Sequence, residues 1–426
     1  MKNRRGMEYN AGMANLTRSS AHRRSRGIGY RRRRPVWLIG LLIALLALGV
    51  IWTAVRAISG SGDGLGTVQD QVQQGTAGSA SGGGAASGGA GGTGGVGGAG
   101  GTGGPEGSGD AEGDAFLTAE QVRALLEAED AAPFDENGCP VTEGQREDRD
   151  ETPLLGGAEL TMLTNQSTGQ MMSFLLKTSG GSLIVIDGGR WEDGDHLFEQ
   201  IREQGGHVSA WLLSHTHTDH VGALLKLLQS QAEGTDMGIT VDRFYYNFAP
   251  LEWYMVHETG DLGTAGSILS QLDALPQEQK QTVERGDVIT VDDVTVTVMN
   301  DRYEPDADTV GERDGNDASI AYRMEVNGLS ILFLGDLQTI GGDLLLEQAG
   351  AEALKSDIVQ MAHHGQHGVS EEVYQAIDPD ICLWPTPDWL WANEDGSYET
   401  TQTQEWMKAL EVKRHYCIKD GDQVIR

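Results

Sequence analysis

Four side chains of the kinds that bind transition metals occur within six residues, in the segment His215-Thr-His217-Thr-Asp219-His220. An apolar run precedes this segment and an amphipathic run follows it, so we expect a strand to deliver it and a helix to begin just after it. Alternate side chains of an extended segment share one side, so His215 and His217 can bind one cation together. Asp219 and His220 then turn toward a neighbouring position. One short loop can in this way hold two metal ions about 3.5 to 4 Å apart.

A single histidine in a loop is most often a polar surface residue, so the count of residues in the motif matters. Histidine occurs 11 times in the 426 residues. Three histidines and one aspartate at this spacing should coincide by chance in fewer than about one in a thousand chains. The motif therefore predicts a metal site.

Two later segments each end an apolar, strand-like run in a potential ligand. Asp336 follows such a run and a glycine, and its carboxylate could bridge two metals. His363 and His364 follow another run. Taken alone these signals are weak, because Gly-Asp is a common turn and a His-His pair can simply be solvated. Combined with the first loop, Asp336 becomes an expected ligand, and either His363 or His364 another.

These motifs resemble the metallo-β-lactamase superfamily of metallohydrolases, over residues 158–426. In that resemblance His215-x-His217-x-Asp219-His220 is the family's motif, Asp336 its bridging aspartate, and His363 or His364 its last histidine. Asp187-Gly-Gly, after a strand, looks like the family's early turn beneath the site. The implied fold is α/β, an αβ/βα sandwich of two mixed sheets with the site along one edge.

The segment Asn316-Asp317-Ala-Ser319 is more similar to one branch of the family, which contains the ComEC-type β-lactamase-like domain and the cell-wall phosphorylcholine esterases. Many family members place another histidine between the first loop and the bridging aspartate. This chain offers only His257 there. His257 is a possible ligand, a satisfied core or loop histidine being the alternative. Asn316 or Asp317 are possible contributors to the same side of the site.

Nitrogen and oxygen donors without cysteine make zinc the expected cofactor, with two Zn²⁺ ions, and ligand type leaves Mn²⁺ or Fe open. The resemblance implies a metal-dependent hydrolase. The expected mechanism is attack by metal-bound hydroxide on a phosphoryl or carbonyl centre, with the metals neutralising the developing oxyanion. Asp219 is the expected catalytic residue, binding metal and orienting the hydroxide.

Hydrophobic periodicity predicts the elements that position these residues. Strands are expected at residues 171–177, 182–187, 209–213, 241–246, 288–299, 319–325, 330–334, 357–360 and 380–384. Helices are expected at residues 196–203, 221–229, 265–275, 342–348, 371–377 and 403–412. Early consecutive strands followed by alternating strands and helices indicate two packed mixed sheets with helices outside.

A single-pass membrane anchor is predicted before this domain. Residues 36–55 carry no charge, and a helix of that length spans about 30 Å of hydrocarbon. Arg31 to Arg34 precede it, which places residues 1–35 in the cytoplasm and the catalytic domain outside the cell membrane. The alternative is a cleaved signal peptide, whose apolar core is usually only about 7 to 15 residues.

Composition separates the remaining segments. Of the 60 glycines, 24 lie between Gly60 and Gly113, so residues 59–114 are expected to be a flexible, disordered linker. Residues 115–157 form a short acidic segment, in which Thr118 and Gln121 predict a helix start. The metallo-β-lactamase-like domain occupies residues 158–426. Cys382 and Cys417 are expected to be small buried side chains, one bonded pair being the alternative.

Charge bears on the substrate. Residues 1–57 hold 12 of the 31 basic and one of the 63 acidic residues, so the rest of the chain carries a net charge of −43. Such a surface disfavours nucleic acid as a partner, although a local basic channel stays open. We therefore expect a small-molecule or cell-envelope ester, with a phosphodiester favoured by the resemblance. The oligomeric state is left open.

The alternative functions are a lactamase or lactonase, a ComEC-like nuclease, and a non-catalytic metal-binding sensor module. Trp384, Trp389 and Trp391 follow the last histidine pair closely. They are expected to pack on the sheet, with recognition of a choline-type ester as the lesser alternative.

Overall fold

The computed structural model describes residues 116–147, 150–305, 315–394 and 396–426. The predicted membrane anchor at residues 36–55, the basic segment before it and the linker at residues 59–114 lie outside the described residues. Within the described part of the chain, no helix is both long and apolar enough to cross a membrane.

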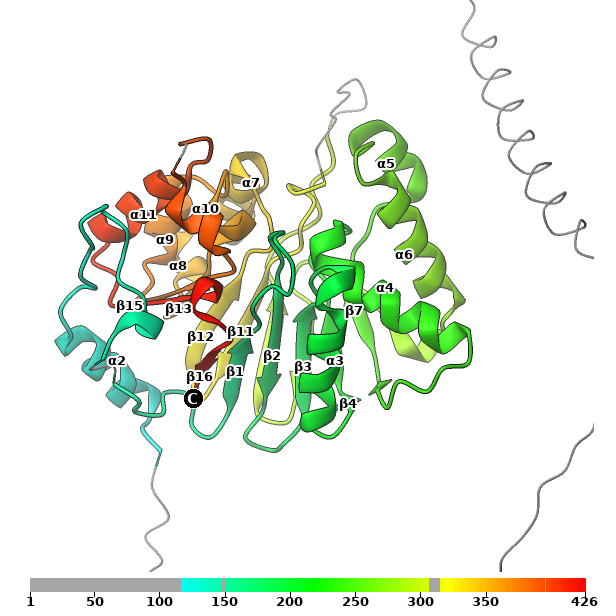
Figure 1. Ribbon diagram of the computed structural model, residues 1–426, viewed down its shortest axis with the longest axis horizontal. Coiled ribbons are helices and arrows are strands. Elements are labelled where there is room, and N and C mark those ends of the chain that lie inside the picture. Colours follow the sequence, from blue (N-terminus) through cyan, green and yellow to red (C-terminus); the bar gives the residue numbers. More distant parts are fainter. Residues whose placement is uncertain (1–115, 148–149, 306–314, 395) are drawn as a thin grey trace, which may run out of the picture. The chain divides into compact units, whose positions relative to one another are not determined.

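Two seven-stranded sheets pack face to face (Figure 1). The first has the order β16-β1-β2-β3-β5-β7-β8, with bounds β1 Glu159–Met162, β2 Ser173–Lys177, β3 Leu183–Asp187, β5 Ala210–Leu212, β7 Phe244–Tyr246, β8 Lys280–Thr282 and β16 Gln423–Ile425. The second has the order β15-β14-β13-β12-β11-β10-β9, with bounds β9 Val288–Val291, β10 Val294–Val298, β11 Tyr322–Val326, β12 Leu329–Phe333, β13 Ile358–Gln360, β14 Ile381–Trp384 and β15 Arg414–Cys417. A separate pair joins β4 His207–Val208 to β6 Thr240–Val241.

Both sheets are mixed, as expected. In the first, β16, β1, β2 and β3 pair antiparallel, whereas β3, β5, β7 and β8 pair parallel. In the second, β9 to β12 pair antiparallel and β12 to β15 pair parallel. The parallel strands β3, β5, β12 and β13 therefore run toward loops that can gather side chains from both sheets.

Three apolar cores hold the layers together. The central core lies between the sheets, where the rings of Phe174 and Phe333 meet edge to face with centroids 5.1 Å apart. The two outer cores lie between each sheet and its helices. In Figure 1, α3, α4 and α6 lie on one side and α7 to α11 on the other, which confirms the αβ/βα sandwich. The helices are α2 Ala119–Ala128, α3 Gly194–Glu203, α4 Thr218–Ala232, α5 Leu251–His257, α6 Leu262–Ala274, α7 Thr339–Ala349, α8 Ala351–Leu354, α9 Glu371–Ile377, α10 Asp388–Ala392 and α11 Thr400–Ala409.

The expected helices correspond to α3, α4, α6, α7, α9 and α11, with boundaries that differ by up to three residues, and the boundaries of some expected strands were wrong. The expected single run at residues 288–299 is a hairpin, β9 and β10, which turns at Asp292 with a φ of 51°. Strands β1, β4, β8, β15 and β16 were not predicted. Periodicity missed β15 because its buried residues include Arg414 and His415.

The expected small or aromatic packing residues behave as predicted with the exception of Trp389, for which the packing prediction was wrong. Cys382 and Cys417 are buried and free. The rings of Trp384 and Trp391 pack together, with centroids 5.1 Å apart. Trp389 is exposed, and its indole donates a hydrogen bond to a loop carbonyl.

The described residues of the acidic segment, 116–147 and 150–157, pack on the sandwich. Helix α2 begins with the predicted capping box at Thr118, and its residues Val122 and Leu126 enter the central core. Arg123 donates two hydrogen bonds to the Asp357 carboxylate, 2.6 and 2.9 Å long. The acidic segment is thus tied to the second sheet by both apolar and ionic contacts.

The buried guanidinium of Arg414 on β15 depends on this segment, because Glu129 at the end of α2 supplies its carboxylate partner. Glu129→Gln removes the nearer carboxylate from a buried cation and leaves it only Asp150, 3.7 Å away, so we expect the free energy of unfolding to fall by about 1 to 3 kcal/mol. Urea denaturation measures the change. Glu127→Gln, on the exposed face of α2, is the matched control and should have no effect. Equal stability of the two variants would contradict this anchoring role.

Candidate metal centre

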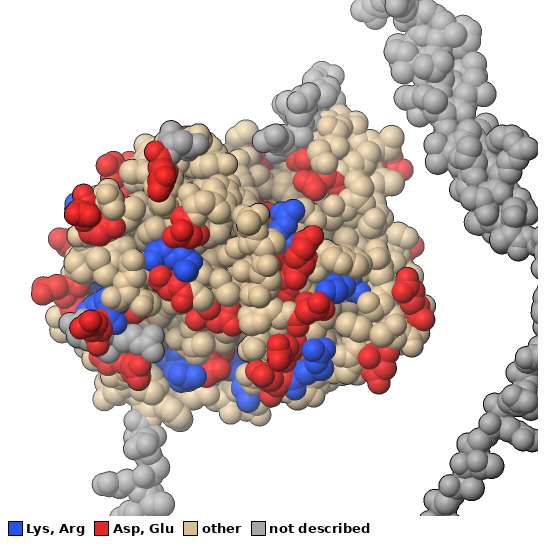
Figure 2. Space-filling view, viewed as in Figure 1, with Lys and Arg blue, Asp and Glu red and all other residues tan. Residues whose placement is uncertain are grey.

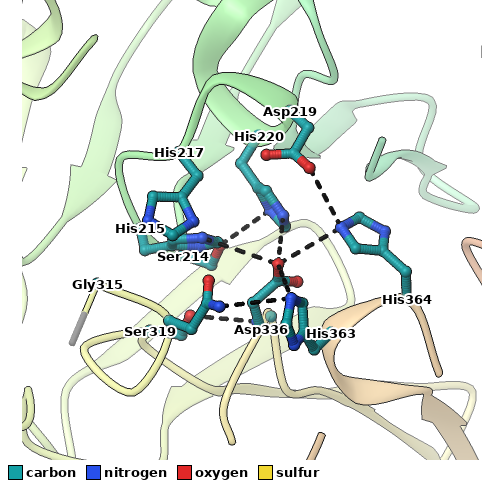
Figure 3. A network of polar contacts seen from close by, with 12 residues as sticks. Ser214, His215, His217, Asp219, His220, Gly315, Ser319, Asp336, His363 and His364 are labelled. Atoms are coloured by element: carbon teal, nitrogen blue, oxygen red, sulfur yellow. Dashed lines mark hydrogen bonds and ion pairs between the residues drawn. The ribbon is translucent and has the colours of Figure 1, made fainter. Parts of the chain in front are cut away.

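The candidate ligands converge where strand ends of the two sheets meet (Figure 3). The loop after β5 carries His215 and His217, and the first turn of α4 carries Asp219 and His220. The loops after β12 and β13 carry Asp336 and the His363-His364 pair. Each loop follows a strand whose flanking residues are buried, so the sheets fix the positions from which these side chains project.

Asp336 lies at the centre of the group, with 1% of its surface exposed. Its Oδ2 atom faces the Nε2 atoms of four histidines that come from both sheets. The distances are 3.1 Å to His220, 3.4 Å to His364, 3.9 Å to His215 and 4.0 Å to His363. One carboxylate is therefore in position to serve two neighbouring cations.

Potential donor atoms fall into groups in which all atoms lie within 4.8 Å of one another. The described residues contain three such groups. They are His215, His217 and Asp336; Asp219, His220 and His364; and His217, Glu258 and Asp261. Asp336 belongs to the first group and links it to the second, because its carboxylate is also close to His220 and His364.

Whether a metal fits this cluster can be judged from the hydrogen bonds of its donor atoms. Among the described residues, the Nε2 atoms of His215, His217, His220 and His364 are buried without a hydrogen bond, and so is Oδ1 of Asp336. Unpaired buried polar atoms are costly, and five that point into one region are rarely retained without a ligand. The histidine and aspartate clusters thus fit a metal site.

Hydrogen bonds behind the imidazoles hold them in the orientation that metal binding needs. Nδ1 of His220 lies 2.7 Å from the Asp187 carboxylate. Ser214 donates its hydroxyl to the same carboxylate and lies 3.0 Å from Nδ1 of His215. His364 has the Pro385 carbonyl 3.0 Å from its Nδ1. Protons on these Nδ1 atoms leave each Nε2 free to bind a cation, as in carboxylate–histidine–metal triads.

The turn that carries Asp336 is built by Gly335 and Gln360. Gly335 has a φ of 58°, and a Cβ there would lie 2.8 Å from Ser214 Cβ. The Gln360 side chain accepts hydrogen bonds from the amides of Leu334 and Gly335 and donates to the Gly335 carbonyl. Only glycine fits this close approach of the two sheets, which places the carboxylate between them.

The His363-His364 turn is strained. Both residues have left-handed backbones, with φ of 49° and 56°, which is uncommon for side chains other than glycine. Because of this turn, the two imidazoles lie in different surroundings. His364 is fully buried in the second donor group, whereas His363 is partly exposed and lies 3.4 Å from the Asn316 amide nitrogen.

Electrostatics couple these groups. Burial by itself lowers the pKa of His364, but the carboxylates of Asp336 and Asp219 outweigh it and raise that pKa to about 9. Burial likewise opposes charge on His220, whose pKa is nevertheless raised well above its usual range by Asp336 and Asp187. Burial, with His220 and His217 nearby, lowers the pKa of His215 well below its ordinary value. In the metal-free protein the second donor group therefore carries protons at neutral pH.

The possible ligands between the main motifs have distinct positions. His257 is buried at the end of α5, 5.0 Å from the ring of Trp253, and is in none of the three donor groups. Asp317 accepts hydrogen bonds from the amides of Gln338 and Gly341, so its Oδ1 caps the start of α7. Asn316 lies beside the cluster.

Sequence reasoning missed Glu258, Asp261 and Gln360. Glu258 directly follows His257, the only histidine in the interval where a further ligand was expected. The only available signal was a pair of acids shortly after His257, and such acids are common on surfaces. Gln360 gave no signal, because an amide at a strand end acquires its partners only in the folded chain.

A cavity of about 540 Å³ opens over the cluster. Its wall includes His217, Asp219, Glu258 and His363, and Arg190 is the one Lys or Arg among the described residues that line it. The cavity is large enough for a small ligand.

One family model and several solved structures are similar to this chain. A family model described as "Metallo-beta-lactamase superfamily" matches residues 168–382. Similar solved structures include the metallo-β-lactamase fold protein YhfI from Bacillus subtilis, with 12% identity, a TM-score of 0.39, and coverage of 63% of this chain and 99% of that chain. A metallo-β-lactamase from Cronobacter sakazakii has 15% identity, a TM-score of 0.30, and coverage of 57% and 89%. The diiron β-hydroxylase CmlA from Streptomyces venezuelae has 12% identity, a TM-score of 0.38, and coverage of 63% and 54%. No curated protein sequence matches the chain.

The raised pKa values predict that metal binding depends on pH. Below pH 9, a metal must displace the proton of His364, so affinity should rise by about tenfold per pH unit for each proton displaced between pH 7 and 9. Calorimetric titration with Zn²⁺ in buffers of different ionisation heats measures the protons released. His207→Gln, at an exposed histidine, should leave the release unchanged. Binding that releases no protons at pH 7 would contradict this assignment.

Proposed function

The chain belongs to the metallo-β-lactamase superfamily, and we propose that it is a metal-dependent hydrolase that cleaves a small phosphodiester outside the membrane to which it is anchored. One observation carries the proposal. The buried Asp336 carboxylate lies among histidines from both sheets, whose Nε2 atoms are unpaired among the described residues.

Two metal ions would share this carboxylate. His215, His217 and Asp336 would hold the first, and Asp219, His220 and His364 would hold the second, with Asp336 beside them. Zinc suits these nitrogen and oxygen donors, and so do manganese and iron. When bound, such metals supply Lewis-acid stabilisation and acidify water at neutral pH.

The chain's own side chains complete the site. Asp219 is buried, yet it lines the cavity. Burial opposes its ionisation, but His364 and His220 outweigh this and lower its pKa. Asp219 therefore stays ionised at neutral pH, where it accepts a hydrogen bond and orients an attacking water but cannot donate a proton to the leaving group.

Arg190 supports an anionic substrate. It lines the same cavity as Asp219 and His363, and about a third of its side chain is exposed. Guanidinium groups bind phosphate oxygens with paired hydrogen bonds. A small phosphodiester in the cavity could contact both Arg190 and the metal pair, which favours this ester over a neutral lactam or lactone.

Surface charge favours a small ester over a polymer. Acidic side chains are spread over the face drawn in Figure 2, and the Lys and Arg side chains of the described residues lie in separate small groups there. A nucleic acid must bring many phosphates close to such a surface, within a Debye length of about 8 Å at physiological salt. A small ester avoids most of this repulsion.

The decisive measurement is a substrate screen of the purified, zinc-loaded protein. We expect a higher kcat/KM for a chromogenic phosphodiester than for a β-lactam, a lactone, or single- and double-stranded DNA. Asp336→Asn should lower metal content and reduce hydrolysis by at least about 100-fold, because both metal positions lose a shared anion. Glu347→Gln, exposed on α7, is the control.

Each other outcome replaces this proposal with a named alternative. DNA cleavage that weakens steeply with salt would indicate a basic channel and the ComEC-like nuclease. Lactam or lactone turnover would indicate those enzyme classes. Metal binding without turnover of any substrate would indicate a sensor module.

The proposed location rests on the basic and apolar segments before residue 56. Protease added to intact cells should release the catalytic domain, because residues after the anchor face outward. A cytoplasmic protein probed in the same samples controls for lysis. Protection of the domain until the cells are lysed would reverse the proposed orientation.

A further inference from the structure

Glu258 is a buried carboxylate at the edge of the metal cluster, with 1% of its surface exposed. It directly follows α5, and its Oε2 accepts a hydrogen bond of 3.0 Å from the Gly315 amide. The same oxygen lies 3.5 Å from Nε2 of His217. That nitrogen has no hydrogen bond within the described part of the chain.

A buried carboxylate needs more compensation than one amide supplies. Direct pairing with His217 does not provide it fully, because the two side chains form no hydrogen bond at this separation. Two ligands that each lie about 2.1 Å from one tetrahedral zinc are about 3.4 Å apart. The separation of 3.5 Å therefore matches that of two side chains that share a cation.

Gly315 keeps the space beside these two atoms open. A Cβ at this position would lie 2.6 Å from Nε2 of His217 and 2.8 Å from Oε2 of Glu258. The backbone thus approaches both donors closely, and a larger residue would displace one of them. This contact fixes Glu258 toward His217.

We propose that Glu258 is a ligand of the metal held by His215 and His217, in the place where many family members have a further histidine. The inference rests on the proposed metal-dependent function and deepens it. Two histidines and one glutamate are a known donor set of catalytic zinc sites that keep a position open for water. A carboxylate in place of an imidazole also makes this position more receptive to harder ions such as Mn²⁺.

Asp261 is the competing carboxylate. Its Oδ2 is 3.9 Å from Nε2 of His217, and its side chain is 34% exposed. It is farther away than Glu258 and partly hydrated, so its charge is compensated by water. Asp261 belongs to the rim of the cavity, and it provides a nearby control of equal charge.

The test measures metal binding by the full chain, independently of activity. Elemental analysis and chelator competition with Zn²⁺ should show that Glu258→Gln loses one ion or binds it at least about tenfold more weakly. In the cobalt-substituted protein, Glu258→Gln should change the visible absorption of the ion at that position. Asp261→Asn and Glu252→Gln, the latter exposed on α5, should bind both ions as the wild type does.

Two ions bound by Glu258→Gln with wild-type affinity would overturn the proposal, and loss of an ion from Asp261→Asn alone would reassign the ligand. If Glu258→Gln does not fold, Glu258→Asp is the second variant, because it retains the charge but shortens the side chain by one methylene. The proposal then requires that Glu258→Asp bind the same ion more weakly. Because no substrate is used, absence of hydrolysis would count against the proposed function only. Hydrolysis by a Glu258→Gln variant that holds two ions would count against this ligand only.

Discussion

The buried carboxylate of Asp336 is the group on which the rest of the site depends. It sits among histidine nitrogens from both sheets at separations from 3.1 to 4.0 Å. An ionised carboxylate at 1% exposure is stable only when positive charge surrounds it, from protonated imidazoles or from metal ions. Because either source can supply this charge, protons and metal ions would compete for the same histidine nitrogens. These nitrogens come from both sheets, so the cluster lies where the two sheets meet.

The sandwich positions this cluster through strand ends and the hydrogen bonds behind them. Asp187 at the end of β3 holds both Ser214 and His220, so one residue of the first sheet orients the loop after β5 and the first turn of α4. Gln360 at the end of β13 performs the matching task in the second sheet, by fixing the Gly335 turn. The ends of the two sheets, and the hydrogen bonds there, thus set the geometry of the candidate ligands.

The two main groups of donor atoms differ in their surroundings. The second is enclosed, with His220 and His364 fully buried. The first opens to the cavity through His217 and is bordered by the carboxylates of Glu258 and Asp261. With metals bound as proposed, the enclosed group would hold its ion more firmly and the open group would leave room for a substrate. The division of roles follows from burial as much as from the identity of the ligands.

Sequence by itself determined the fold class and most of the cluster, because strongly apolar runs and closely spaced metal-binding residues are local signals. Residue types and spacing suffice to identify the His215 loop, Asp336 and the His363-His364 pair, and the folded chain brings them together. The tertiary structure alone decided that His364 enters the cluster while His363 stays at its edge, because two left-handed residues turn the chain there. It also decided that Glu258, and not His257, faces the cluster. Such choices depend on which side of a short helix meets a distant loop, and that contact exists only after both sheets have packed.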